Sequence, residues 1–410
     1  FIDTNNNGIY EPFYGDYPKI KGDLAVYFII NDDRNVHTVS GGEPLIIEIH
    51  GMAYGFNCPG SNALDNTLFL NYSIFNRSQN TYADMYIGFF MDLDIGGYTD
   101  DFMACDVNRS TFYAYNGDSL DESSNGATGY GTSPPAQSCT FLNGPLQDAD
   151  GSDNNFGVGL NESVNGIGFG DGIIDNERRG LDRFISDLTI LTDPTIPISY
   201  YNILQGKMSY GPNLTYGGTG TNGVDTCKFM FPKDSDPYNF GTWGSTPNYP
   251  FSDGWSEENE NAPSGERRGV GSTGPFTFEP GDIQEITIAF VFAESDTGSQ
   301  YSSVVLMQQY IDDVRGMYVA DTTPCGYGVF SSLPEQELEK ISFEIYPNPT
   351  SNLLHISGTE PANSVYRIYD MAGKLVAEEK LTQSIIDVSR LSTGLYFIKI
   401  DNYTQRFIKN

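Results

Sequence analysis

The chain has 410 residues and is rich in turn-forming and aromatic residues, with 45 Gly, 22 Pro, 27 Tyr and 26 Phe. Its 54 Asp and Glu residues outnumber 22 Lys and Arg residues, which gives a formal net charge of −32. This charge argues against nucleic acid and anionic membranes as partners, because both bind basic surfaces. No apolar run reaches the roughly 20 residues that a transmembrane helix needs.

Length and composition predict a mainly β protein built of several parts. We expect an N-terminal segment over residues 1–20, a large antiparallel β-sandwich of jelly-roll-like type over 21–320, a linker over 321–340 and a small seven-stranded, Ig-like β-sandwich over 341–410. The large sandwich should carry long loops and one or two helices. The chain has five cysteines, so at least one must remain unpaired.

The N-terminal segment contains half of an EF-hand-type loop. Oxygen-bearing side chains alternate at Asp3, Asn5 and Asn7, a glycine follows, and Ile9 stands where such loops supply a backbone carbonyl. The twelfth position is Tyr14 instead of the usual glutamate. We therefore expect calcium to bind residues 1–20, with a plain Asn-Gly turn as the alternative.

Four segments alternate as strands at 23–31, 44–54, 66–76 and 82–94. The last is the most regular, because apolar side chains occupy one face at every second position from Ala83 to Leu93. Asp92 and Asp94 share the other face, about 7 Å apart from the strand rise, and Asp100 and Asp101 follow a Gly-Gly turn. With oxygen ligands only, this cluster predicts calcium, and the alternative is a solvated acidic loop.

A loop region rich in Gly, Asn, Asp and Ser extends over residues 118–172 and needs something to fix it in place. Two groups of acids are available, and we expect calcium to staple the loops through them: Asp148, Asp150 and Asp153, then Asp171, Asp175 and Glu177. The arginine pairs 178–179 and 267–268 are interpreted as internal counter-ions, with an anion clamp as the alternative.

The loops at 211–274 hold both tryptophans, Trp243 and Trp255. An exposed Trp can stack on a sugar ring, whereas packing beneath a loop is the commoner role. Residues 286–292 alternate as a strand, 199–208 suggest a short helix, and 302–318 form the clearest amphipathic helix. Only three histidines occur, and no HExxH or GxSxG motif accompanies them, so we expect no enzyme in this stretch.

The last seventy residues carry four ordered motifs: Tyr346-Pro347-Asn348-Pro349, then Tyr369-Asp370-Met371-Ala372-Gly373-Lys374, then Ser392-Thr393-Gly394-Leu395-Tyr396 and finally Arg406-Phe407-Ile408-Lys409. This stretch resembles the type A C-terminal sorting domain of cargo for the type IX secretion system of Bacteroidota. The resemblance implies export across both membranes, with the secretion machinery as partner and an extracellular or outer-surface location. It also implies a signal peptide, so we expect more sequence upstream of Phe1.

Residues 10–320 resemble a recurrent region of large secreted Bacteroidota proteins with no assigned activity, through DLDIG with its following acids, GFGDGIIDNERRG and RRGVGSTGPFTFEPGD. Ser119 and Thr322 stand in Asp-Ser/Thr sequences that resemble O-glycosylation sites of the same bacteria. The expected function is that of a non-catalytic, calcium-stabilised surface protein acting in adhesion or an extracellular assembly, with itself or glycans as partners. The alternatives are a carbohydrate-binding module and the C-terminal part of a secreted hydrolase.

Overall fold

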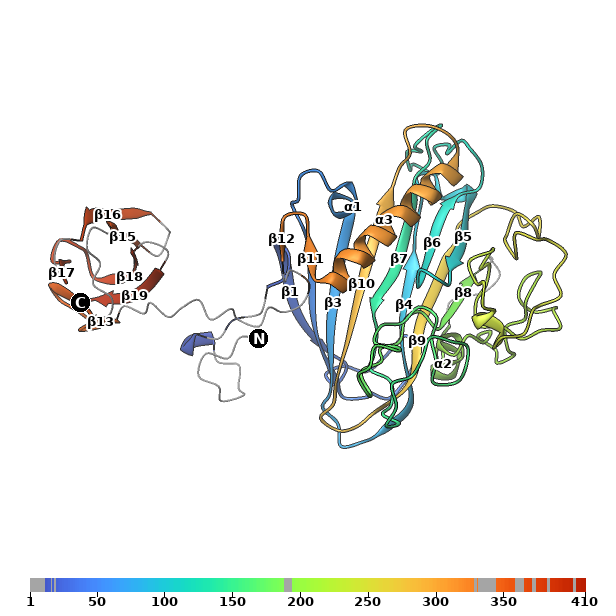
Figure 1. Ribbon diagram of the computed structural model, residues 1–410, viewed down its shortest axis with the longest axis horizontal. Coiled ribbons are helices and arrows are strands. Elements are labelled where there is room, and N and C mark those ends of the chain that lie inside the picture. Colours follow the sequence, from blue (N-terminus) through green and yellow to red (C-terminus); the bar gives the residue numbers. More distant parts are fainter. Residues whose placement is uncertain are drawn as a thin grey trace. The chain divides into compact units, whose positions relative to one another are not determined.

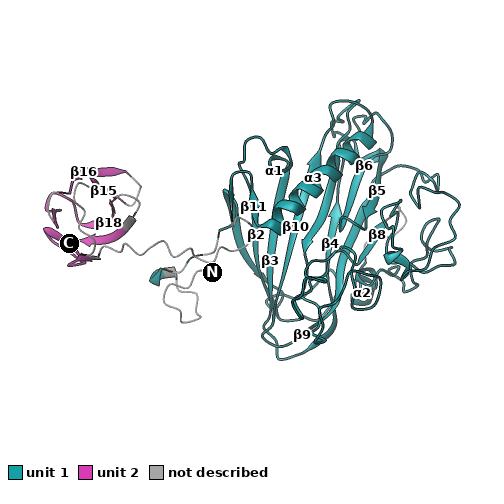
Figure 2. Cartoon of the chain, in the orientation of Figure 1, with its two compact units in different colours: residues 1–332 teal, residues 333–410 magenta. Residues whose placement is uncertain are grey.

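The computed structural model describes residues 12–15, 17, 20–187, 194–327, 330, 344–357, 365–370, 374–381, 384–400 and 403–410. The chain divides into two compact units, residues 1–332 and 333–410 (Figure 2). The expected calcium ligands Asp3, Asn5, Asn7 and Ile9 lie outside the described residues.

A seven-stranded antiparallel sheet forms the centre of the first unit (Figure 1). In spatial order its strands are β1 (Leu24–Asn31), β2 (Ile47–Gly55), β3 (Thr67–Asn76), β10 (Ile283–Ala293), β7 (Ala136–Asn143), β6 (Thr111–Asn116) and β5 (Asp101–Asp106). Among the described strands, β10 alone joins the β1–β3 half of the sheet to the β5–β7 half.

A second antiparallel sheet packs on one face of the first and has the order β4 (Tyr82–Asp92), β9 (Arg268–Phe278) and β8 (Arg183–Asp187). Aromatic rings join the two sheets: Phe89 of β4 meets Phe141 of β7 edge-on at 5.7 Å, and Phe112 of β6 stacks on Phe184 of β8 at 5.0 Å. The prediction of a mainly β, antiparallel sandwich is confirmed. Its sheets have seven and three strands.

The alternation expected along β4 is correct except at its start. Asp84 has a left-handed backbone (φ 54°), and the pairing of β4 with β9 shifts register on either side of Met85. This bulge leaves Ala83 exposed, whereas Met85, Ile87 and Phe89 pack against the core as expected.

The opposite face of the large sheet is covered by the helix α3 (Gln300–Ala320), which crosses β10, β7 and β6 (Figure 1). Five residues were expected to face the core: Val304, Met307, Ile311 and Val314 are buried, and Tyr318 is partly buried against the core. A capping box at Ser299 starts the helix. The other helical elements among the described residues are short: α1 (Asn62–Asp65), α2 (Pro197–Leu204) and 3-10 turns at Pro12–Tyr14, Tyr98–Asp100 and Phe240–Thr242.

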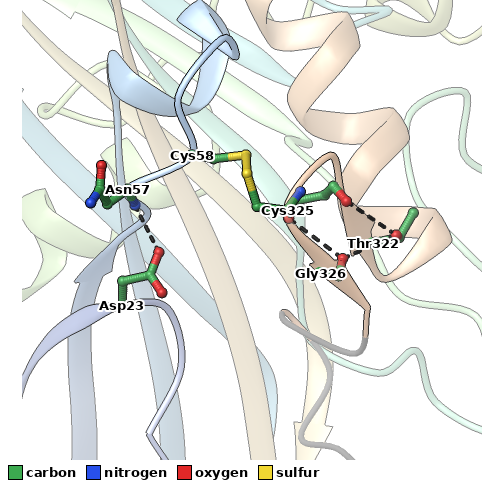
Figure 3. Close-up of a disulfide and its surroundings, with 7 residues drawn as sticks. Asp23, Asn57, Cys58, Thr322, Cys325 and Gly326 are labelled. Carbon is green, nitrogen blue, oxygen red and sulfur yellow. Dashed lines mark hydrogen bonds between the residues drawn. A yellow bond between two sulfur atoms is a disulfide. The ribbon is translucent and has the colours of Figure 1, made fainter.

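One disulfide, Cys58–Cys325, joins the segment before α1 to the hairpin of β11 (Thr322–Thr323) and β12 (Gly326–Tyr327), which follows α3 (Figure 3). The remaining three cysteines, Cys105, Cys139 and Cys227, are free and buried. The bridge therefore ties the end of the covering helix back to the β1–β3 half of the sheet.

The second unit is a small sandwich of two antiparallel sheets, β13-β14-β17 and β16-β15-β18-β19. Its strands are β13 (Glu344–Tyr346), β14 (Leu353–Ser357), β15 (Val365–Asp370), β16 (Leu375–Lys380), β17 (Ile385–Asp387), β18 (Gly394–Ile400) and β19 (Tyr403–Lys409). The seven strands match the number expected for the tail. In the parts of both units that the structure describes, no helix is long and apolar enough to cross a membrane.

Candidate functional site

An acidic site lies where β5 begins and β6 ends. Asp101 and Asn116 are direct cross-strand partners, so their side chains project from the same face of the sheet. Both are buried, with 1 % of Asp101 and 0 % of Asn116 exposed. Asp100 precedes β5 in the chain, and both of its carboxylate oxygens are shielded from solvent.

Four buried oxygens at this site accept no hydrogen bond of good geometry from the described residues: both of Asp100, Oδ1 of Asp101 and Oδ1 of Asn116. The other oxygen of Asp101 accepts the Ile95 amide at 2.9 Å. Buried acceptors are normally satisfied, because an unpaired one costs roughly 1 to 3 kcal/mol. This concentration of unsatisfied oxygens therefore requires a physical explanation.

The loop that follows β6 packs Asp121 against the same site. Asp121 is buried, and its two oxygens accept the amides of Gly97 at 2.8 Å and Tyr130 at 2.7 Å. A Cβ atom on Gly96 would collide with this carboxylate, and Gly96 also has a left-handed backbone (φ 55°), so only glycine suits this position. Sequence reasoning missed Asp121, because it is one of many acids in a polar loop.

Like charges dominate the electrostatics of the site. Burial, with Asp100 and Asp121 nearby, raises the pKa of Asp101 to about 8. Burial, together with Asp121 and Glu122, raises the pKa of Asp100 to about 6, and the neighbouring Asn116 amide offsets part of that rise. The pKa of Asp94 is also raised, by burial and then by Asp92. Of the four expected calcium ligands Asp92, Asp94, Asp100 and Asp101, the last two contribute the buried oxygens of this site.

Asp92, which was also expected to bind calcium, already has a charged partner. It forms an ion pair with Arg268 across β4 and β9 at 3.2 Å, and Arg268 also binds Glu266. Asp94 is exposed. The pairing of Asp92 with an arginine matches the counter-ion role expected for the 267–268 pair.

The other arginine of that pair, Arg267, has a buried partner that the sequence did not suggest. Its guanidinium binds Glu257 through two nitrogens, at 2.9 Å and 2.7 Å, and both side chains are almost fully buried. Glu257 also accepts the Met103 amide at 2.9 Å, which joins the pair to β5. Burial raises the pKa of Glu257, and Arg267 offsets part of that rise.

Five of the six acids expected to staple the long loop accept hydrogen bonds from the loop itself, and the sixth, Asp148, accepts them from Thr277 of β9. Asp153 accepts the amides of Gly170 and Gly172, and Asp175 accepts those of Asp150 and Gly151. The remaining four also accept hydrogen bonds: Asp148 from Thr277, Asp150 from Ser152, Asn154 and Asn161, Asp171 from Ile173 and Asn176, and Glu177 from Asn154. Carboxylate–amide bonds therefore hold this region together. Nowhere in the described chain do three or more His, Cys, Asp or Glu side chains form a group suited to a metal ion.

The two tryptophans have different environments. Trp255 is fully buried between Phe231 and Tyr216, and its indole N–H donates to the Gly218 carbonyl. It is therefore inaccessible to a sugar, which corrects its candidacy as a ligand contact. Trp243 is half exposed, and the ammonium of Lys228 lies 5.2 Å from its ring centroid.

The two candidate glycosylation residues also differ. Ser119 is exposed in the loop after β6. Thr322 is partly buried in the β11–β12 hairpin, where its hydroxyl donates to the Gly326 carbonyl at 3.1 Å (Figure 3). A modifying enzyme would reach Ser119 more easily.

The motif residues of the tail hold its last strands together. Asn348, between Pro347 and Pro349, donates to the Arg406 carbonyl and accepts the Ile408 amide, so the first motif is fastened to β19.

Tyr396 stacks on Phe407 at 5.6 Å and donates to the Ser392 carbonyl, and Gly394 pairs with Lys409 at the end of β18. Asp370 and Lys374 close a turn through their backbones, and Gly373 lies outside the described residues.

These features define a β-sandwich protein with a separate, motif-rich C-terminal sandwich. Residues 344–410 match the family model of the secretion system C-terminal sorting domain. The chain is therefore a cargo protein of the type IX secretion system, exported to the extracellular space or the cell surface. No curated protein matches the chain in sequence.

Proposed function

We propose that the exported chain is a non-catalytic structural protein that works by association with other copies of itself outside the cell. The observation that carries this proposal is the edge strand β1. It is apolar along its length and exposed on both faces, with 79 % of Leu24, 63 % of Val26 and 48 % of Ile29 accessible.

Edge strands of soluble proteins are usually protected by charged residues, prolines, bulges or short length. The strand β1 has none of these, because it spans eight residues without charge or proline and pairs with β2 in unbroken register. Its outer backbone groups face no other strand among the described residues. Such an edge is suited to strand addition, in which main-chain hydrogen bonds supply affinity.

A second copy of the chain is the occupant that the charges favour. The protein carries a net charge of −32, so most of its surface repels another copy. The strand β1 is an uncharged strip within that surface, and two such strips can pair antiparallel about a two-fold axis. This pairing would continue the large sheet from one molecule into the next.

The test is the association state of the full chain, measured by sedimentation over a range of concentrations. We expect the unaltered chain to form dimers or larger species, and V26K/I29K to be monomeric with an unchanged melting temperature. The matched control V224K/V319K alters residues that are 95 % and 70 % exposed elsewhere, and it should associate normally. A monomeric unaltered chain, or equal association of all three proteins, would contradict the proposal.

Carbohydrate binding is the second candidate, favoured by the half-exposed ring of Trp243. A shallow depression of about 430 Å³ along α3 offers another polar and aromatic surface, lined by Ser295, Tyr301, Ser302, Val305, Leu306 and Gln309. Glycan-array binding that W243A abolishes would support this function. Binding that W243A leaves intact but Y301A abolishes would transfer the site to α3.

A further inference from the structure

We propose that Asp100, Asp101 and Asn116 form a calcium site at the open end of β5 and β6. The sequence predicted that aspartates in this region bind calcium. It did not indicate Asn116, or the strand pairing that places Asn116 opposite Asp101. The site is independent of the association through β1, because it lies at the other edge of the large sheet.

The first step of the argument is the set of unsatisfied oxygens. Two carboxylates and one amide supply four buried oxygen atoms that accept no hydrogen bond of good geometry from the described residues. Asn116 is especially informative, because it is uncharged, fully buried and directly opposite Asp101 in the ladder. Its Nδ2 group donates to the Asp118 carbonyl at 3.1 Å, which leaves Oδ1 as the unused end of the amide.

The second step is charge. In the part of the chain that the structure describes, no Lys or Arg forms an ion pair with Asp100 or Asp101, and the other acids that raise their pKa values are Asp121, Glu122, Asp118 and Asp94. The Gly265 amide donates a hydrogen bond to the Asp101 carbonyl, and Arg267 follows two residues later in the chain. Arg267, however, already forms an ion pair with Glu257. A cation from solution would therefore be the counter-charge for both carboxylates.

The third step is the identity of the cation. Carboxylate and amide oxygens are hard ligands, and the described residues of the site offer no histidine nitrogen or cysteine sulfur, so calcium fits better than zinc. Calcium takes six to eight oxygens in flexible geometry, so backbone carbonyls and water would complete the shell around these four. Magnesium demands a tighter octahedron and gives up its water reluctantly.

Asp121 would position the site without binding the ion. Both of its oxygens accept backbone amides, one from the Gly97 turn and one from Tyr130. The Gly97 bond fastens the loop after β6 to the turn before β5, and the Tyr130 bond closes that loop on itself. Calcium would then fix three segments that are separate in sequence, at residues 95–101, 116–131 and 264–265.

The experiment compares the full chain with D100N/D101N and with a control, D171N/D175N, that removes two acids from the 148–177 loop. Thermal unfolding is followed in calcium, in magnesium and in chelator, and calcium binding is measured by calorimetry. Calcium at 100 times its Kd should raise the melting temperature of the unaltered chain by about 4 °C. D100N/D101N should bind calcium at least tenfold more weakly and show no calcium-dependent shift.

The isosteric substitutions guard against a simple folding failure, since they remove buried like charges and should not lower stability in chelator. The control should retain the full calcium response. The proposal is overturned if calcium has no effect on the unaltered chain. It is also overturned if the response survives D100N/D101N, or if it is lost only in D171N/D175N, which would place the ion in the long loop.

Discussion

Replacing Glu257 by glutamine should be one of the most damaging single changes of charge in the first unit. The substitution keeps the size of the side chain, and its amide oxygen can still accept the Met103 amide. What disappears is the negative charge beside Arg267. Among the described residues, its buried guanidinium then keeps the carbonyls of Pro263 and Glu266 as acceptors.

The magnitude follows from burial. Arg267 is 2 % exposed and Glu257 is fully buried, so water cannot replace the lost partner. Breaking a buried ion pair from one side costs about 3 to 5 kcal/mol, because one charge remains without compensation. The neighbouring pair of Asp92 and Arg268 is 40 % and 35 % exposed, and loss of such a surface pair costs at most about 1 kcal/mol.

Urea unfolding followed by tryptophan fluorescence measures both changes, since Trp255 is buried in the same unit. We expect E257Q to lower the free energy of unfolding by about 3 kcal/mol and D92N by less than about 1 kcal/mol. The double variant E257Q/R267M should recover much of the loss, because it removes the stranded charge. Equal effects of E257Q and D92N would refute the reasoning that burial determines the cost.

Two further predictions concern pH and the disulfide. In chelator, the pKa of Asp101 is about 8 in the folded protein and near 3.8 when unfolded, so the folded state binds more protons between these values. The free energy of unfolding should therefore fall as pH rises from 4 to 8, by up to about 1.4 kcal/mol per pH unit. D101N should flatten this slope. An equal slope in D101N would contradict the conclusion that Asp101 causes it. For the second prediction, C58S/C325S should lose about 3 to 5 kcal/mol, because the bridge spans 267 positions of the chain. Equal urea midpoints with and without the bridge would show that it contributes nothing.

The sequence predicted those features that depend on a repeating local pattern. The helix α3 was placed with its buried face correct, because apolar residues at three- and four-residue spacing leave one choice of face. The strands β1 to β4 and β10 were found from alternation. The one error within them, Ala83, arises from the left-handed residue Asp84, and nothing local marks an aspartate as the site of a bulge.

The sites were harder to predict, because they depend on pairings between distant segments. Asp101 meets Asn116 only because β5 and β6 pair in one register, and Glu257 meets Arg267 across an irregular loop. Cysteine pairing was equally inaccessible, since Cys58 and Cys325 adjoin only once α3 has crossed the sheet. Spacing along the chain contains none of this information.

The position of β10 late in the sequence affects how the first unit folds. The two halves of the large sheet are complete in sequence by residue 143, yet the strand that unites them begins at Ile283. Until that strand is in place, β3 and β7 each present an open edge on which another chain could assemble. A chain cut short before Ile283 should therefore aggregate instead of forming a smaller stable domain, and contacts of such long range also imply slow folding.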